Sequence, residues 1–181
     1  MQGMKERKRL NAAALWEYAL RVLGGRAHSS GELREKLRSR AEHLGDVDAT
    51  LARLKDYGYL NDRKFAENFA ATRLENEGLG KTRVLADLSR RRVAPAVAQQ
   101  TVGKVYSGVD EAALAEDFVR RKFRMVSRQN LFQDEKEMAS AYRRLLRAGF
   151  RSGTSITVLK KFARDPDLLD SFEPPEEPAE D

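Results

Sequence analysis

One segment of this chain looks like part of a nucleotide-binding motif. Residues 78–82 read Gly-Leu-Gly-Lys-Thr, which is like the end of a phosphate-binding loop, where a lysine and a hydroxyl serve nucleotide phosphates and magnesium. The first glycine of that motif would fall at position 75, which is Glu75, and the segment follows an expected helix instead of a strand. The sequence therefore disfavours a nucleotide-binding site.

The histidines and acids do not form a recognisable site either. His28 and His43 are the only histidines, and in a chain without cysteine they cannot assemble a usual zinc site. Asp62 has no evident base or nucleophile as a partner and is better suited to capping a helix. We therefore expect a protein that is not an enzyme, with no catalytic residue, no cofactor and no metal site.

Charge is the property that points to a partner. All 34 basic residues and 20 of the 28 acidic residues lie in residues 1–164, which therefore carry a formal charge of +14. A body this cationic attracts polyanions and gains affinity by counterion release, which favours nucleic acid or a nucleoprotein as the partner. The same residues are also compatible with ordinary solvated helix faces, and charge alone does not separate the two interpretations.

Both ends of the chain differ from this body. Four of the five prolines lie in residues 166–181 among acids, and this composition predicts a disordered acidic tail. Residues 1–9 form a basic N-terminal arm without the apolar stretch of a secretory signal. No apolar run approaches the roughly 20 residues that a membrane-spanning helix needs. We therefore expect a cytoplasmic protein that does not bind membranes.

The elements that must position the charges are expected to be helices. Glycines separate stretches whose apolar residues recur every three or four positions, and no segment alternates as a strand would. Ser29 with Glu32 and Asp134 with Glu137 have the spacing of capping boxes. Further N-cap candidates are Asp46, Asn61 or Asp62, Thr82 and Asp110. The pattern predicts nine helices, over residues 11–23, 30–42, 47–57, 62–77, 82–91, 95–106, 111–125, 134–148 and 154–164.

The expected helices repeat along the chain. A shift of 51 residues takes Leu37 onto Leu88, and a further shift of 57 takes Leu88 onto Leu145. Similar shifts align the other apolar positions of three consecutive helices. A unit of about 50 residues has a small core, so neighbouring copies are expected to pack together. We predict an all-α fold of three tandem three-helix repeats in an elongated array, with the repeats at 10–60, 61–108 and 109–165.

Two stretches are specific enough to compare with a known family. Residues 26–33 read Arg-Ala-His-Ser-Ser-Gly-Glu-Leu, and residues 57–66 read Tyr-Gly-Tyr-Leu-Asn-Asp-Arg-Lys-Phe-Ala. Both resemble the RecX family, bacterial regulatory proteins of the RecA recombinase, and the resemblance runs from about residue 12 to 164. Arg92 stands where a glycine is often found in that family, and Lys81 stands where proline is common. These two differences concern local turn geometry.

The resemblance implies a function by binding. RecX-like proteins are three-repeat helical proteins that lodge in the groove of the RecA filament on single-stranded DNA and restrain strand exchange, ATP hydrolysis and the coprotease activity linked to the SOS response. The implied partners are the RecA filament and the single-stranded DNA within or beside it, the expected effect is inhibition, and the protein is expected to be a monomer. We expect basic residues to supply much of the contact, namely Arg73, Arg83, Arg90, Arg91, Arg120, Arg121, Lys122, Arg143, Arg144 and Arg147.

Other interpretations of the same residues stay open. A three-helix unit is also compatible with a helix-turn-helix DNA-binding regulator of transcription, which needs a recognition helix and usually a dimer. An enzyme acting on nucleic acid is disfavoured, because the sequence has no clustered carboxylates or metal ligands. Four aromatic residues could stack on bases, but packing is their expected role. They are Tyr57, Tyr59, Phe65 and Phe69.

Overall fold

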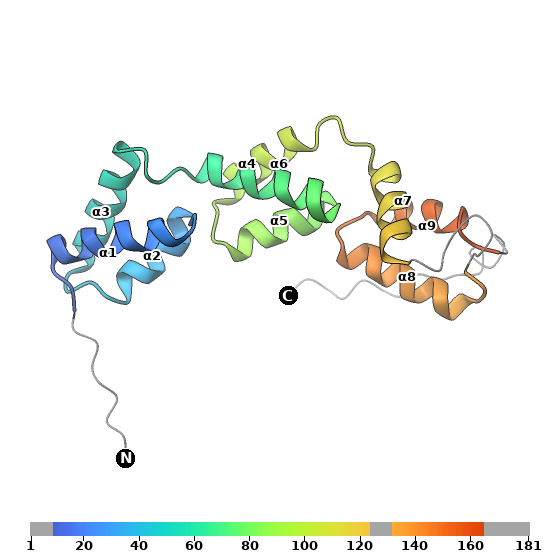
Figure 1. Cartoon of the computed structure of the whole chain (residues 1–181), viewed down its shortest axis with the longest axis horizontal. Coiled ribbons are helices and arrows are strands. Elements are labelled where there is room, and N and C mark those ends of the chain that lie inside the picture. Colours follow the sequence, from blue (N-terminus) through green and yellow to red (C-terminus); the bar gives the residue numbers. More distant parts are fainter. Residues whose placement is uncertain (1–8, 124–131, 165–181) are drawn as a thin grey trace, which may run out of the picture. The chain divides into compact units, whose positions relative to one another are not determined.

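The computed structural model describes residues 9–123 and 132–164, and these form helices and no β-strand (Figure 1). The basic arm up to residue 8 and the acidic tail 166–181 lie outside the described residues. The finding confirms the all-α prediction and the series of three-helix repeats. The helices are α1 (Ala12–Gly25), α2 (Ser30–Arg38), α3 (Leu44–Asp56), α4 (Asp62–Thr72), α5 (Lys81–Arg90), α6 (Pro95–Val105), α7 (Glu111–Lys122), α8 (Glu135–Arg147) and α9 (Ser152–Lys160), with a π-helical segment, η1 (Arg73–Glu77), after α4.

The described chain divides into two compact units. The first unit contains residues 9–71 and 85–105, which include α1 to α3, most of α4 and α5, and α6. The second unit contains residues 72–84, 106–123 and 132–164, which include η1, the first turn of α5, and α7 to α9. Each unit is described separately below.

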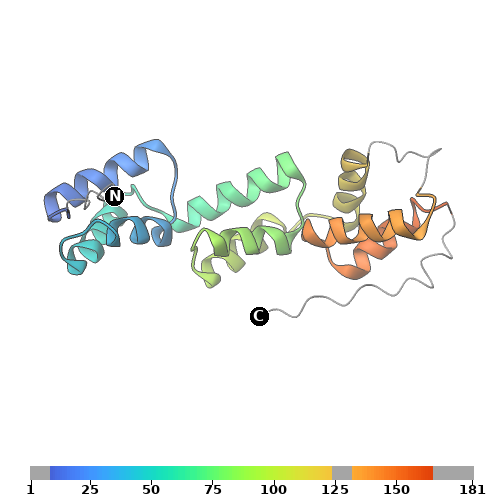
Figure 2. The ribbon, with the colours of Figure 1, turned by 90° about the horizontal axis from the view of Figure 1, so that it is seen from below.

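In the first unit, α1, α2 and α3 pack side by side around one core (Figures 1 and 2). Leu15 of α1, Leu37 of α2 and Leu54 of α3 are completely buried there. Helix α1 begins after Asn11, whose side chain accepts a hydrogen bond from the Ala14 N–H. The capping box predicted at the start of α2 is present in full. The apolar periodicity and the capping residues thus account for the core of this repeat.

In the second unit, α7 and α8 both pack against α9, as the two ribbon views show (Figures 1 and 2). Phe118 of α7 meets Phe150, which follows α8, edge to face with 5.5 Å between the ring centroids. The buried hydroxyl of Tyr142 is hydrogen bonded to Ser152 Oγ over 2.8 Å. The predicted cap Asp110 accepts hydrogen bonds from the first turn of α7, as expected.

Some predicted element boundaries are wrong. Helix α3 begins at Leu44, so Asp46 lies inside its first turn and does not cap it. Helix α5 begins at Lys81, so Thr82 is also inside a first turn. The expected helix 62–77 changes to π-helix at Arg73, where hydrogen bonds reach one residue further along the chain. Residues 124 and 125, at the end of another expected helix, lie outside the described residues.

In both units, a hydrogen bond to a backbone carbonyl joins the start of the second helix of one repeat to the turn of the following repeat. In the first unit, Ser29 Oγ donates a hydrogen bond to the carbonyl of Arg91. In the second unit, the N–H of Gly80 donates to the carbonyl of Ala148 over 2.8 Å. The shifts of 51 and 57 residues that align the repeats carry Ser29 onto Gly80 and Arg91 onto Ala148. The two contacts are therefore equivalent, and we call each one a repeat joint.

The turn in each repeat joint has a residue in the left-handed region of backbone conformation. In the second unit this residue is Gly149, with a φ of 90°. In the first unit it is Arg92, with a φ of 56°, the one described residue other than glycine with a positive φ. A side chain at such a φ is sterically unfavourable, so glycine suits this turn better than arginine does.

Candidate nucleic-acid and protein interface

Helix α8 carries exposed basic side chains that meet an arginine from α5 in the second unit. Arg143 and Arg147 lie four residues apart on one face of α8, and Arg147 Nε donates to the carbonyl of Arg143 over 3.3 Å. From α5, Arg83 Nη1 donates to the carbonyl of Arg147 over 3.3 Å. Three arginines of the predicted set therefore converge at the C-terminal end of α8. We call Arg83, Arg143 and Arg147 the α8 arginine group.

The arginines of α8 are the next feature of this surface. Among the described residues, no carboxylate forms a salt bridge with Arg143, Arg144 or Arg147. Arg144 lies near the ring of Phe123, with 5.1 Å from its Cζ to the ring centroid. Arg144 and Arg147 are in the last turn, where positive charge is favourable to the helix dipole. The arrangement leaves donors of the arginine side chains exposed and able to meet phosphate or carboxylate.

The basic end of α7 is partly occupied by internal contacts. Arg121 donates to the carbonyls of Asp117 and Glu77, each over 3.4 Å. Arg120 forms an ion pair with Glu116 at 3.6 Å, and the same carboxylate binds Lys161 from beyond α9. Lys122 is exposed at the end of α7. Of the three predicted residues here, Lys122 is the one with the most freedom to reach a ligand.

The remaining predicted residue of the second unit belongs to the π-helical segment. Arg73 forms an ion pair with Glu77, four residues further on, and about one third of its side-chain surface is exposed. The carbonyl of Glu77 accepts the hydrogen bond from Arg121 described above. Arg73 and Arg121 are therefore brought together at Glu77, apart from the α8 arginine group.

In the first unit, the predicted residues Arg90 and Arg91 have structural roles. Arg91 Nη1 binds Glu32 Oε1 over 2.6 Å, and its Cζ lies 5.9 Å from the ring centroid of Phe65. Arg90 pairs with Asp87, whose side chain is only 8% exposed. The Arg91–Glu32 ion pair links the second repeat to the first at the repeat joint, whereas the Arg90–Asp87 pair lies within α5. These two arginines are therefore poor candidates for the main ligand contact.

Glu32 is the acidic centre of that joint. It also pairs with Arg26 over 3.2 Å and accepts a hydrogen bond from the N–H of Ser29. Burial raises the pKa of this carboxyl, but the hydrogen bonds from Arg26, Arg91 and Ser29 outweigh burial and hold the pKa below its ordinary value of 4.5. Glu32 therefore stays ionised and binds both arginines across the neutral pH range.

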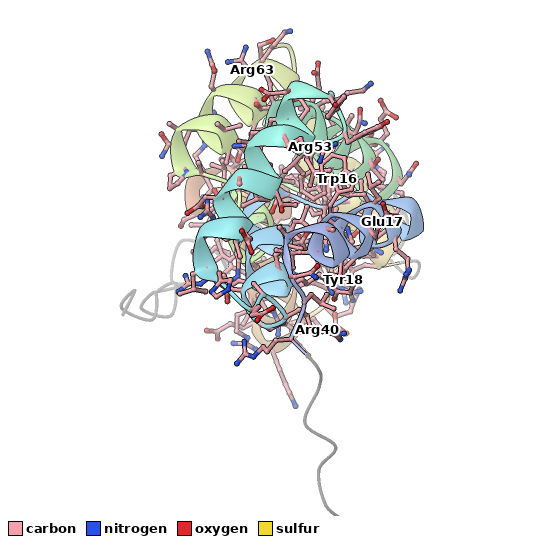
Figure 3. All side chains as sticks on the ribbon, turned by 90° about the vertical axis from the view of Figure 1, so that its left-hand side faces the viewer. Trp16, Glu17, Tyr18, Arg40, Arg53 and Arg63 are labelled. Atoms are coloured by element: carbon pink, nitrogen blue, oxygen red, sulfur yellow. The ribbon has the colours of Figure 1, made fainter. Side chains whose placement is uncertain are left out.

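The first unit holds a cluster of aromatic rings around an arginine that was not predicted from the sequence. Arg53 of α3 lies over the ring of Trp16 of α1, with 4.0 Å from its Cζ to the ring centroid, and Figure 3 labels the two side chains next to each other. Tyr57 is next to Trp16, with 5.9 Å between centroids, and Tyr59 stacks on Tyr57 at 6.1 Å. We call these four residues the aromatic cluster.

The expected packing role is wrong for two of the four aromatic residues considered from the sequence. Tyr57 and Tyr59 are 60% and 58% exposed. Phe65 and Phe69 are half-buried and stack on each other at 6.2 Å beneath Arg91, which confirms packing for this pair. The tyrosines lie in the turn after α3, where the apolar periodicity of a helix no longer indicates which face is buried.

The segment that is like a phosphate-binding loop has a structural role instead. The N–H of Gly80 is already bonded to the carbonyl of Ala148, so it is not available to a phosphate. Lys81 and Thr82 form the first turn of α5 and line a cavity of about 380 Å³ together with Tyr106 and Glu111. Burial raises the pKa of Tyr106 to about 12, and its hydroxyl donates to the carbonyl of Leu79.

His28 and Asp62 support the start of α2. Asp62 Oδ1 accepts a hydrogen bond from the N–H of Ser30 over 2.6 Å, so it caps α2 from a distance, while Asn61 caps α4. His28 Nδ1 is bonded to the carbonyl of Arg26 over 2.8 Å, and burial lowers the pKa of its ring below 6.5. Neither residue is placed near a partner for bond chemistry.

Neither a metal-binding cluster nor a membrane-spanning helix is found among the described residues. Within residues 9–123 and 132–164, no three histidines or acids are grouped so that they could hold a metal ion. No helix in the same part of the chain has the length and apolar character needed to cross a membrane. The exposed side-chain groups described above are the α8 arginine group and the aromatic cluster.

This fold and these surfaces define a helical-repeat binding protein, and comparisons with known proteins identify the family. Residues 16–54 match the first three-helix domain of RecX, and residues 61–102 match its second three-helix domain. A regulatory protein RecX from Amycolatopsis mediterranei is 33% identical over 153 residues, covering 82% of this chain and 83% of the relative. The chain belongs to the RecX family of regulatory proteins.

Other relatives agree with this assignment. The regulatory protein RecX of Syntrophotalea carbinolica is 27% identical, covering 76% of this chain and 88% of the relative. The crystal structure of RecX from Lactobacillus salivarius matches with a TM-score of 0.63 at 20% identity, covering 83% of this chain and 96% of that one. At this identity the structural match establishes the shared fold.

Proposed function

We propose that this protein binds the filament that RecA recombinase forms on single-stranded DNA and inhibits its recombinase, ATPase and coprotease activities in DNA repair and the SOS response. Membership of the RecX family supports the choice of partner. The observation that carries the mechanism is the α8 arginine group, three arginines that converge on one helix end. The protein acts by surface contact, as a monomer in the cytoplasm, and performs no bond chemistry.

The physical basis is the affinity of clustered arginines for anions. A guanidinium group presents donors in a planar fork that matches phosphate or carboxylate, and grouped arginines add further ion pairs on the same ligand. Contacts to DNA phosphates release counterions, so binding weakens as salt rises. A nucleoprotein filament offers phosphates and acidic protein side chains together, and both suit this surface.

The test compares two double charge reversals in equivalent helices. Arg143→Glu with Arg147→Glu removes two members of the α8 arginine group from the second helix of the third repeat. Lys36→Glu with Arg38→Glu makes the same charge change in the second helix of the first repeat, where both residues are exposed. Each protein is added to pre-formed RecA filaments on single-stranded DNA, and ATP hydrolysis and filament length are followed at two salt concentrations.

We expect the wild-type protein to slow ATP hydrolysis and shorten the filaments, and the control reversal to behave similarly. The α8 reversal should lose about tenfold or more in potency, since two arginine–anion contacts of about 1 kcal/mol each are lost and replaced by repulsion. Equal potency of the two reversals would contradict the role of the α8 arginine group. Protection of a specific duplex sequence, without any effect on filaments, would favour the transcriptional regulator instead.

A further inference from the structure

The aromatic cluster exposes more ring surface than the fold of the first repeat requires. Trp16 contacts the core of the first unit with part of its ring, and Arg53 covers another part. Tyr57 and Tyr59 extend from this anchor into solvent, with 27° between their ring planes. Exposed neighbouring rings are uncommon without a function, because burying an aromatic side chain is strongly favourable.

The turn that carries the two tyrosines is fixed by backbone hydrogen bonds. The N–H of Tyr59 donates to the carbonyl of Leu54 over 2.9 Å, and the N–H of Gly58 donates to the carbonyl of Lys55 over 2.9 Å. These two bonds form a Schellman motif, in which Gly58 has the required left-handed φ of 73°. The tyrosines are therefore presented in a set position at low cost in conformational entropy, as in a preorganised binding site.

The surroundings of the rings are basic and polar. Residues 53–64 contain four basic and two acidic side chains, and one of the acids, Asp62, already caps α2. A cavity of about 310 Å³ lies beside Tyr59 and is lined in part by Asn61, Lys64 and Asn68. Amide and ammonium groups that line a cavity beside an exposed ring are suited to hydrogen bonds with base edges and with phosphates.

From these observations we propose that the aromatic cluster is a stacking site for the bases of single-stranded DNA. Rings with an arginine beside a basic, polar groove are the combination by which proteins hold unpaired bases without reading their sequence. Stacked Tyr57 and Tyr59 offer one continuous platform, and Lys64 would meet the phosphate of the stacked nucleotide. A protein ligand is the other possible occupant, and it is separated by the experiment below.

The inference rests on the proposed function only for the identity of the biological strand, which is the DNA inside the recombinase filament. Binding to free single-stranded DNA can be measured without recombinase. Failure of one proposal is therefore distinguishable from failure of the other.

Trp16 is the only tryptophan of the chain, so its fluorescence reports directly on the aromatic cluster. The full-length protein is titrated with a 15-nucleotide oligothymidylate and with an abasic strand of the same length, which has the phosphates but no bases. Tyr57→Ser with Tyr59→Ser removes the two exposed rings. Leu44→Ser is the matched control, because Leu44 is 61% exposed in the same repeat and lies outside the cluster.

We expect oligothymidylate to change the Trp16 fluorescence and to bind about tenfold more tightly than the abasic strand, a difference typical of base stacking on aromatic rings. The tyrosine double variant should lose this preference for bases and keep its helical circular dichroism, and Leu44→Ser should retain the preference. Equal binding of both strands by the wild-type protein would overturn the inference.

Two further outcomes separate the proposals. In the first, the wild-type protein shows no preference for bases while the tyrosine double variant still regulates filaments as the wild type does. That result would overturn the stacking site and leave the proposed function intact. Loss of binding to DNA-free recombinase in the double variant, with unchanged DNA binding, would assign the cluster to a protein partner and also overturn the inference. A preference for bases without any effect on filaments would support the stacking site and contradict the proposed function.

Discussion

The repeat joint of the second unit predicts that a single added methyl group is destabilising. A Cβ at Gly80 would lie 2.2 Å from the carbonyl oxygen and 2.4 Å from the carbonyl carbon of Gly149, and 2.8 Å from the N of Phe150. All three atoms belong to the backbone, so no side chain can rotate away to relieve the clash. Gly80→Ala must therefore displace the turn that follows α8 or the start of α5.

The expected cost follows from two destabilising effects and one stabilising effect. Overpacking a well-ordered contact typically costs about 1–3 kcal/mol. The displaced turn would also weaken the hydrogen bond from the Gly80 N–H to Ala148, which contributes about 1 kcal/mol. Replacing glycine by alanine restores about 0.4–1 kcal/mol by restricting the unfolded chain. We expect a net loss of about 1–3 kcal/mol in the free energy of unfolding.

Thermal unfolding followed by circular dichroism measures this loss. For a protein of this size, 1 kcal/mol corresponds to about 2–4 °C in Tm, so Gly80→Ala should lower Tm by several degrees. Gly153→Ala in α9 is the control, because nothing lies within 4 Å of its added Cβ and alanine favours a helix. Hydrogen exchange should also quicken at residues 80–84 and 147–151 in Gly80→Ala.

A glycine near the repeat joint of the first unit, two residues after Ser29, provides an independent check of the same reasoning. A Cβ at Gly31 would lie 2.3 Å from the carbonyl oxygen of Arg92. Gly31→Ala should therefore lose stability in the same way as Gly80→Ala. A Tm for Gly80→Ala at or above that of the wild type, or equal to that of Gly153→Ala, would refute the assignment of Gly80 to a closely packed joint.

Two further predictions concern the joint of the first unit. Arg92→Gly should be neutral or raise the free energy of unfolding by up to about 1 kcal/mol in urea denaturation, because it relieves a positive φ and loses only an exposed ion pair at 3.9 Å. A clear loss of stability would show that the Arg92 side chain matters. Glu32→Gln should cost about 2 kcal/mol at pH 7, and Glu35→Gln, at a half-exposed position of the same helix, should cost almost nothing. The pKa of Glu32 is lowered on folding, so its contribution to stability is present above pH 4.5 and disappears as the pH falls through the lower folded value. The free energies of unfolding of the wild type and Glu32→Gln should therefore converge in acid. A difference that stays constant with pH would contradict the role of the ion pairs.

Local physics in the sequence accounts for much of the fold. Ser29 and Asp134 cap their helices because their oxygens reach N–H groups that have no partner within the helix. Asp46 has the same chemistry, yet α3 begins two residues earlier, at Leu44 after an extended His43. A capping residue can also lie inside a first turn, where its charge is favourable to the helix dipole. Spacing alone therefore does not fix where a helix starts.

The candidate surfaces were harder to predict because they depend on distant residues. Arg91 and Glu32 are 59 positions apart, and nothing local to Arg91 indicates that it is held by a partly buried acid. The α8 arginine group likewise needs Arg83 from another repeat. Trp16 and Tyr57 meet only when α1 packs on α3. The charged and aromatic residues can be read from the sequence. Which of them are held by internal contacts, and which are exposed to a ligand, becomes visible only when the repeats are packed.

The aromatic cluster and the α8 arginine group should respond differently to salt. In the first unit, a strand held at the aromatic cluster gains from stacking, which salt screens little, in addition to the phosphate contact proposed for Lys64. No carboxylate among the described residues pairs with Arg143 or Arg147, so a ligand of these two arginines gains from counterion release and is lost steeply as salt rises. Under these two proposals, raising the salt concentration should remove filament contacts of the second unit first and leave the base preference of the first unit, which can then be measured alone.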